Sequence, residues 1–343
     1  MASAPVLVTR RLPEEAIARL TASCEVTLWQ EERPMPRARL LADSAGKAAI
    51  ITLLSDRVDD ELLEAAGAGL RIVANYAVGV DNVDLAACSR RAVMVANTPD
   101  VLTEATADMA WALVMAAARR VAEGDRVLRA GSAWVWGPEM MLGREVYGKT
   151  LGIVGFGRIG RAVARRAGGF GMRVLAAERS GGAAGAGGAA GTGGAAGTGG
   201  AGGEVEWLPL DDLLAASDFV SLHVNLSDET RHLLDRERLA RMRPTAVLVN
   251  TSRGPVVDEA ALAEALSAGR LFAAGLDVFE AEPHVHPDLL SHPRVVLTPH
   301  LGSATVDTRR AMGILAVDNV LEALAGRRPP ALVNEDAFRR PKA

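Results

Sequence analysis

The sequence has few of the features that mark secreted, metal-binding or membrane proteins. Only two of its 343 residues are cysteines, Cys24 and Cys88, which are too few for a disulfide framework or a cysteine-based metal site. The formal net charge is −4, so there is no electrostatic case for binding nucleic acid or an anionic membrane surface. The most apolar helical stretch, residues 107–118, is too short to span a bilayer, and the apolar run 6–8 is too short for a signal peptide. We therefore expect a cytoplasmic protein without a metal.

A glycine pattern between two apolar runs is the strongest signal in the chain. The run 151–154 predicts a buried strand, and residues 161–170 predict a helix. Between them the spacing G-x-G-x-x-G places three glycines: Gly155, Gly157 and Gly160. Among 35 glycines, this spacing alone could mark an ordinary turn. Because a strand precedes it and a helix, a second strand and a carboxylate follow it, we interpret it as a dinucleotide-binding site.

Each residue of this motif has a physical reason to be there. Gly155 permits a tight turn, Gly157 lets the backbone approach a pyrophosphate, and Gly160 lets helix and strand pack closely. The pyrophosphate would lie on the free N–H groups at the helix N-terminus. Glu178, at the end of the second strand, can accept hydrogen bonds from the adenosine ribose hydroxyls.

Apolar runs alternate with helical patterns along most of the chain. We expect strands at residues 6–9, 26–28, 49–53, 71–74, 93–96, 151–154, 173–177, 219–222, 246–250, 272–276 and 295–297. We expect helices at residues 14–21, 37–42, 59–66, 85–91, 103–118, 161–170, 211–216, 235–242, 258–268 and 305–325. This alternation predicts an α/β fold with two doubly wound parallel sheets.

The break at Asn97-Thr-Pro-Asp divides the two predicted domains. We expect a substrate (catalytic) domain at 1–100 and 299–343, because the last helix returns to the first domain. A Rossmann NAD(P)-binding domain at 101–298 would then be inserted in it. Within it, residues 181–203 comprise 13 glycines, 8 alanines and 2 threonines, which we interpret as a flexible surface loop; a functional linker is the alternative.

Polar side chains follow three of the later strands. Arg253 comes after the strand 246–250, Glu282 after 272–276 and His300 after 295–297. A parallel sheet places these three side chains at the edge that also carries the glycine loop, near the nicotinamide end of a cofactor.

The three side chains together suit one reaction. A guanidinium binds a substrate carboxylate, an imidazolium protonates the adjacent carbonyl oxygen as hydride arrives, and a carboxylate orients the imidazole. Taken singly, each has a structural explanation: a surface cation, an exposed turn residue and a satisfied structural histidine. The loop histidines His284, His286 and His292 could bind a metal, but no Cys or Asp/Glu cluster supports such a site.

Nearly the whole chain apart from 181–203 resembles the D-isomer-specific 2-hydroxyacid dehydrogenase family, and within it the glyoxylate/hydroxypyruvate reductases. The motifs that carry the resemblance are Ala74-Asn-Tyr-Ala-Val-Gly-Val-Asp, Asn97-Thr-Pro-Asp-Val-Leu-Thr-Glu-Ala-Thr-Ala-Asp, Val146-Tyr-Gly-Lys-Thr-Leu-Gly-Ile-Val-Gly-Phe-Gly-Arg-Ile-Gly, Asn250-Thr-Ser-Arg-Gly, Gly275-Leu-Asp-Val-Phe-Glu-Ala-Glu-Pro and Thr298-Pro-His-Leu-Gly-Ser-Ala-Thr. The resemblance implies a flavodoxin-like substrate domain. It also implies a homodimer, in which residues 134–136 and the long helix from residue 103 form the interface.

The resemblance further implies roles for individual residues. Arg253 would bind the substrate carboxylate together with the N–H groups of Val78 and Gly79, and His300 would be the acid/base with Glu282 as its partner. Five further residues match cofactor-contact positions of the family: Thr106, Arg158, Ile159, Thr251 and Asp277, the last expected near the carboxamide. We also assign Gly302 to cofactor binding.

The cofactor preference depends on three residues after the second strand of the glycine motif. Glu178 would repel a 2′-phosphate and favours NAD(H), whereas Arg179 and Ser180 resemble the phosphate-binding pair of NADP-dependent relatives. We expect NAD(H), with NADP(H) as the alternative.

The function that we expect is reduction of glyoxylate to glycolate and of hydroxypyruvate to D-glycerate. One alternative is a dehydrogenase for another D-2-hydroxyacid, such as 3-phosphoglycerate. The other is a dinucleotide-sensing binding protein, like some transcriptional corepressors.

Overall fold

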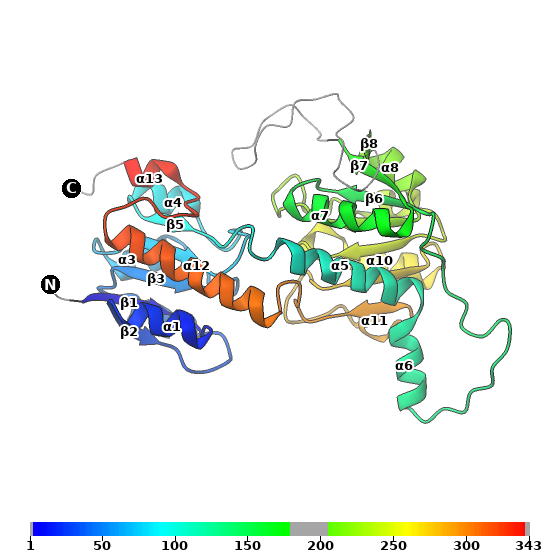
Figure 1. The fold of residues 1–343 in the computed structure, drawn as a ribbon, viewed down its shortest axis with the longest axis horizontal. Coiled ribbons are helices and arrows are strands. Elements are labelled where there is room, and N and C mark those ends of the chain that lie inside the picture. The colour runs from blue at the N-terminus through cyan, green and yellow to red at the C-terminus, as the bar shows by residue number, and fades with distance from the viewer. Residues whose placement is uncertain (1–2, 179–204, 340–343) are drawn as a thin grey trace. The chain divides into compact units, whose positions relative to one another are not determined.

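The computed structural model describes residues 3–178 and 205–339, which form two compact units (Figure 1). Unit 1 comprises Met1–Leu102 and Ala304–Ala343, and unit 2 comprises Thr103–Ser303. The tract 181–203, Arg179 and Ser180 lie outside the described residues, so the structure does not address the expectations for them.

Unit 1 is built on a parallel sheet of five strands in the order β2-β1-β3-β4-β5. The strands are β1 (Ala4–Val8), β2 (Cys24–Leu28), β3 (Ala49–Thr52), β4 (Ile72–Asn75) and β5 (Met94–Ala96). Helices α1 (Glu14–Thr21) and α12 (Val306–Leu324) pack on one face, and the other carries α2 (Arg37–Ser44), α3 (Asp60–Ala66) and α4 (Leu85–Arg90). This strand order is the flavodoxin-like one. A short helix, α13 (Glu335–Arg339), ends the described chain.

Unit 2 contains a parallel sheet of seven strands in the order β12-β11-β10-β9-β6-β7-β8. The strands are β6 (Thr150–Val154), β7 (Arg173–Ala177), β8 (Val205–Leu208), β9 (Phe219–Leu222), β10 (Val247–Asn250), β11 (Ala273–Leu276) and β12 (Val295–Leu297). The strand order reverses at β6: β7 and β8 extend the sheet on one side of it, and β9 to β12 extend it on the other. A Rossmann fold has the same reversal, and a dinucleotide binds beside it.

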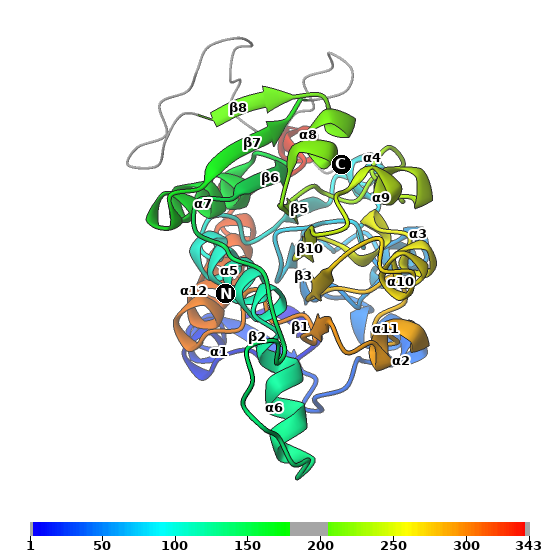
Figure 2. The same cartoon turned by 90° about the vertical axis from the view of Figure 1, so that its right-hand side faces the viewer.

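The helices of unit 2 cover both faces of its sheet. One face packs against α5 (Thr103–Ala118) and α7 (Arg158–Ala167), and the other against α8 (Leu210–Ala216), α9 (Arg236–Arg241), α10 (Glu259–Ser267) and α11 (Pro287–Ser291). Helix α6 (Val121–Arg129) projects from the rest of the unit and has no buried residue (Figure 2). None of the helices that the structure describes is long and apolar enough to cross a membrane.

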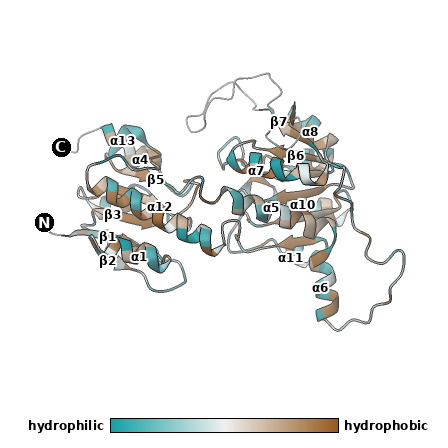
Figure 3. Cartoon of the chain, viewed as in Figure 1, coloured by the Kyte–Doolittle hydropathy of each residue, from teal (hydrophilic) through white to brown (hydrophobic). Residues whose placement is uncertain are grey.

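The buried strands explain why the alternation in the sequence predicts the fold. Strands β4, β9 and β10 are buried along their whole length, as expected for parallel strands covered on both faces. In Figure 3 the strands are mostly hydrophobic, whereas α1 and α7 show hydrophilic surfaces. The predicted fold class, two parallel α/β domains of which one is a Rossmann domain, is confirmed.

Several predicted boundaries are wrong. Helix α7 begins at Arg158 rather than at residue 161, because extended Gly157 is its N-cap and the helix starts inside the glycine motif. Helix α11 lies between His286 and His292, in a segment that the sequence predicts to be a loop. Pro287 takes a first-turn position of this helix, where no N–H donor is needed. Helices α6 and α13 were not predicted either.

Candidate active site

The three predicted polar side chains lie just beyond three adjacent strands of unit 2. Arg253 follows β10, Glu282 follows β11 and His300 follows β12. Because β10, β11 and β12 are parallel neighbours, their carboxyl ends share one edge of the sheet. The glycine loop after β6 lies at the carboxyl edge of the same sheet.

His300 and Glu282 form a hydrogen-bonded pair. Nδ1 of His300 lies 3.0 Å from Oε2 of Glu282, and both side chains are partly exposed. Burial favours the protonated form of Glu282, but the hydrogen bond and charge of His300, the Phe279 N–H and the charge of Arg253 outweigh it. The pKa of Glu282 therefore lies below its usual range, and the side chain is a carboxylate at neutral pH. Such a partner orients the imidazole.

Asp277 holds the turn that carries His300. Its carboxylate is buried and accepts hydrogen bonds from three donors of this turn: Thr298 Oγ1 at 2.6 Å, Leu301 N at 2.7 Å and Gly302 N at 2.7 Å. Burial raises the pKa of Asp277, although these donors act in the opposite direction. His300 itself has a positive φ of 55°. We did not predict this bracing role, and the expected contact of Asp277 with a carboxamide stays a prediction.

Arg253 projects from a tight turn braced by Asn250. The Asn250 side chain donates to the Arg253 carbonyl at 2.9 Å and accepts from the Ser252 N–H at 3.0 Å. The next residue, Gly254, is buried directly against the loop after β11: a Cβ there would lie 1.8 Å from the Phe279 carbonyl carbon. The loops of Arg253 and Glu282 therefore touch through their backbones.

The glycine loop fits a bound dinucleotide. Gly155 has φ +98°, and a Cβ there would lie 2.5 Å from the His223 carbonyl carbon, so only glycine fits this turn. A Cβ on Gly160 would lie 2.3 Å from the Gly155 oxygen, which agrees with the predicted close packing, whereas a Cβ on Gly157 would meet open space. The backbone at Gly157, the N-cap of α7, is therefore accessible, as a pyrophosphate site requires.

The other predicted cofactor positions lie on four elements of unit 2. Thr251 is buried after β10, and its hydroxyl has no hydrogen-bond partner among the described residues. A bound ligand would supply that partner. Thr106 is buried in the first turn of α5, Arg158 is exposed and Ile159 half-buried at the start of α7, and Glu178 is exposed just after β7. These side chains can hold a dinucleotide, and their contacts with one stay predictions.

The predicted substrate loop follows β4 in unit 1. Val78 and Gly79 are half-buried, and their carbonyl oxygens accept hydrogen bonds from Asn97 Nδ2 at 2.7 Å and Asn75 Nδ2 at 2.8 Å. We did not predict a role for either asparagine. The available signal was a polar residue, Asn75, ending a fully buried strand.

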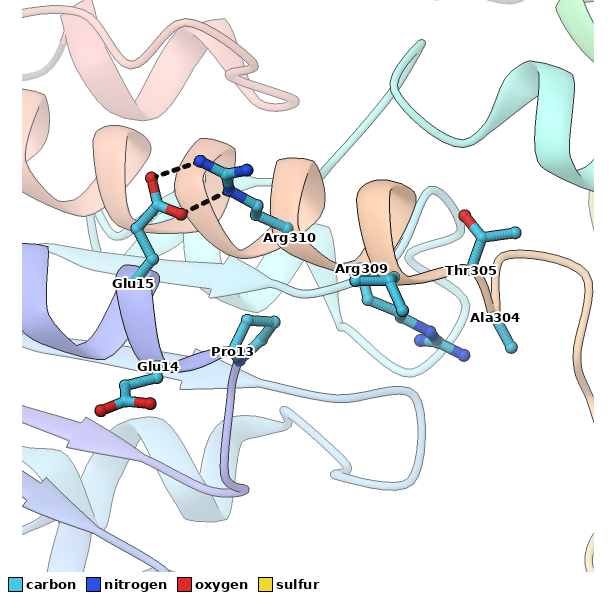
Figure 4. Close-up of a pocket in the computed structure, with 8 residues that line it drawn as sticks. Pro13, Glu14, Glu15, Ala304, Thr305, Arg309 and Arg310 are labelled. Carbon is cyan, nitrogen blue, oxygen red and sulfur yellow. Dashed lines mark hydrogen bonds and ion pairs between the residues drawn. The ribbon is translucent and has the colours of Figure 1, made fainter.

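The remaining histidines and a surface groove give no second site. His286 and His292 each accept a hydrogen bond from a nearby backbone N–H, and no group of three His, Cys, Asp or Glu in the described chain could hold a metal. A shallow groove of about 530 Å³ lies in unit 1 between the starts of α1 and α12 (Figure 4). The Glu15–Arg310 ion pair crosses one side of it, and no predicted site residue lines it.

Comparison with known proteins agrees with this arrangement. Residues 111–302 match the family described as D-isomer specific 2-hydroxyacid dehydrogenase, NAD binding domain. The chain therefore belongs to the D-isomer specific 2-hydroxyacid dehydrogenases, which are oxidoreductases with small-molecule substrates, and the predicted family is confirmed.

Individual relatives are more specific. The chain is 48% identical to a glyoxylate reductase of Pyrococcus furiosus over 97% of this chain and 96% of that protein. It is also 48% identical to a glyoxylate reductase of Korarchaeum cryptofilum over 97% of each. Its fold is similar to that of the NADPH-dependent glyoxylate/hydroxypyruvate reductase of Sinorhizobium meliloti in complex with NADP and malonate, with a TM-score of 0.82 and 34% identity over 99% of each chain.

Proposed function

We propose that the chain reduces a small 2-oxoacid to the D-2-hydroxyacid with NAD(P)H, most readily glyoxylate to glycolate and hydroxypyruvate to D-glycerate. The observation that carries the proposal is the His300–Glu282 pair, which lies at the same sheet edge as Arg253 and the glycine loop. The names of the relatives at 48% identity support the choice of substrates.

Each of the three polar side chains has one task in this reaction. Arg253 binds the substrate carboxylate through a charge-assisted, two-pronged pair. Because Nδ1 of His300 faces Glu282, Nε2 is the nitrogen that gives its proton to the substrate carbonyl oxygen. Glu282 holds the imidazole in this orientation and stabilises its positive charge. The nicotinamide, when bound, supplies the hydride.

The configuration of the product tests the proposal. Hydroxypyruvate is incubated with the enzyme and NADH, and the glycerate formed is resolved on a chiral column. We expect D-glycerate. Formation of L-glycerate, or of no glycerate, would contradict the proposal.

We infer that NAD(H) is the preferred cofactor, because exposed Glu178 follows β7 where the adenosine ribose would lie. Replacing Glu178 by glutamine removes the charge that repels a 2′-phosphate. We expect the ratio of kcat/KM with NADH to kcat/KM with NADPH to fall about tenfold. Glu206→Gln serves as the control and should leave the ratio unchanged. It removes an exposed carboxylate of the neighbouring strand β8, which pairs with Arg173 of β7. An unchanged ratio in Glu178→Gln would refute this basis for cofactor choice.

We propose that the protein is a homodimer joined through the segment after α6. Four apolar side chains within residues 134–142 are at least half exposed: Trp134 (54%), Val135 (86%), Trp136 (79%) and Leu142 (60%). A cluster of this kind is typical of a subunit contact. We expect sedimentation equilibrium to give twice the mass of the 35.9 kDa chain. The double change Trp134→Ser/Trp136→Ser should shift the measured mass towards that of the monomer. Leu290→Ser, at an exposed leucine of α11, should leave the mass unchanged. A dimer that persists in the double variant would refute the proposed interface.

We also propose that the protein works in the cytoplasm. Its two cysteines are free and buried, and burial raises the pKa of the Cys88 thiol to about 12. Neither cysteine forms a disulfide, which suits a reducing compartment.

A further inference from the structure

Three successive peptide units of the loop after β4 are held by their carbonyl oxygens. Each carbonyl accepts a hydrogen bond from a donor elsewhere in unit 1: Ala77 O from Thr98 N (2.8 Å), Val78 O from Asn97 Nδ2 (2.7 Å) and Gly79 O from Asn75 Nδ2 (2.8 Å). Two of the three donors are side-chain amides. The orientation of these peptides is therefore set by donors that lie outside residues 77–79.

A carbonyl held in this way also fixes the N–H of the same peptide, because a trans peptide is planar. The N–H groups of these three units belong to Val78, Gly79 and Val80. None of the three has an acceptor among the residues that the structure describes, and all three residues are half-buried. Consecutive N–H groups of fixed direction and without an acceptor are suited to binding an anion.

Asn75 is itself locked in place. It is fully buried at the end of β4, and its amide oxygen accepts from Thr52 Oγ1 at 3.0 Å. Its amide nitrogen donates to the Asn82 side chain at 3.0 Å as well as to the loop. Asn82 in turn donates to the carbonyls of Leu53 and Asp56. Every polar group of the Asn75 amide is used, so its bond to Gly79 cannot swing away without breaking others.

We propose that Asn97 and Asn75 are positioning residues for the substrate carboxylate. Asn97 holds the peptide between Val78 and Gly79, and thereby the Gly79 N–H, while Asn75 holds the next peptide, and thereby the Val80 N–H, before the substrate arrives. This inference rests on the proposed function and on the predicted contact of the Gly79 N–H with the carboxylate. The carboxylate does not react, so its binding is the same in the ground state and the transition state. Loosening the loop should therefore raise KM and leave kcat nearly unchanged.

The sharpest variant is Asn97→Ala, because the described side chain of Asn97 makes a hydrogen bond only to the Val78 carbonyl. We expect the KM for glyoxylate to rise about tenfold, with kcat and the Kd for NADH changed by less than about twofold. Asn75→Ala should raise KM at least as much. If Asn75→Ala fails to fold, the Asn97→Ala result decides.

Asn334→Ala is the matched control. Asn334 lies in the same unit, accepts from Val95 N at 2.7 Å and donates to Val93 O at 3.0 Å, without contact to the loop. We expect this variant to lose thermal stability but to keep the wild-type KM. An unchanged KM in Asn97→Ala, or an equal rise in Asn334→Ala, would overturn the positioning role. A wild-type protein without turnover on any 2-oxoacid would instead overturn the proposed function, and this inference with it.

Discussion

Replacing His300 by alanine is expected to lower kcat for glyoxylate reduction roughly a thousandfold, while the Kd for NADH stays unchanged. A positioned general acid contributes roughly 10²–10⁴ to the rate of such a step, and no other imidazole is paired with Glu282 in the described chain. The measurement is the initial rate of NADH oxidation, with NADH binding followed by its fluorescence. His284→Ala, at an exposed histidine just after Glu282, should keep the wild-type rate.

Glu282→Gln examines the other half of the pair. Because the pKa of Glu282 is lowered in the folded protein, its carboxylate contributes to the free energy of unfolding. This contribution is complete above the pKa of an ordinary carboxyl group and is lost as the pH falls through the lowered value. At neutral pH the side chain is therefore charged. In Glu282→Gln we expect kcat at neutral pH to fall about tenfold or more, because a neutral amide cannot stabilise the imidazole cation that gives the proton. A kcat of Glu282→Gln equal to that of the wild type, or a His300→Ala enzyme within tenfold of the wild-type rate, would remove this pair from the mechanism.

Gly254→Ala is expected to destabilise the fold by about 3 kcal/mol or more and to lower kcat/KM at least tenfold. The added Cβ would lie 1.8 Å from the Phe279 carbonyl carbon and 1.9 Å from its oxygen, both backbone atoms that cannot rotate away. The loop of Arg253 must therefore separate from the loop of Glu282. Thermal unfolding and steady-state kinetics measure the two effects.

The same substitution in an open position provides the control. Gly124 lies within α6, and a Cβ there would approach no atom closer than 3.9 Å. Gly124→Ala should stabilise the protein by roughly 0.5–1 kcal/mol, because alanine loses less backbone entropy in a helix. If Gly254→Ala were as stable and active as wild type, the contact between the two loops would not matter for the site.

The sequence was sufficient for the features that depend on local periodicity. Apolar runs predicted the buried strands, and because parallel strands end at one edge, the runs before Arg253, Glu282 and His300 placed these residues beyond three neighbouring strands. Helix α11 was missed because a five-residue helix is too short to show a periodic pattern.

Contacts between distant segments were beyond such reasoning. The Asn97–Val78 bond joins residues that are close only once β4 and β5 pair, and nothing in the local sequence indicates it. Asp277 also braces the turn of His300 through three donors of that turn, a role that nothing in the local sequence indicates. Amide and carboxylate roles of this kind depend on which backbone groups tertiary packing leaves without partners.

The most direct test of the central claim is the initial rate of the wild-type protein with glyoxylate and with hydroxypyruvate, each with NADH and with NADPH. We predict rapid turnover of both substrates with NADH and slower turnover with NADPH. Tight NADH binding with negligible turnover of these and other 2-oxoacids would contradict the account and indicate a dinucleotide-sensing protein.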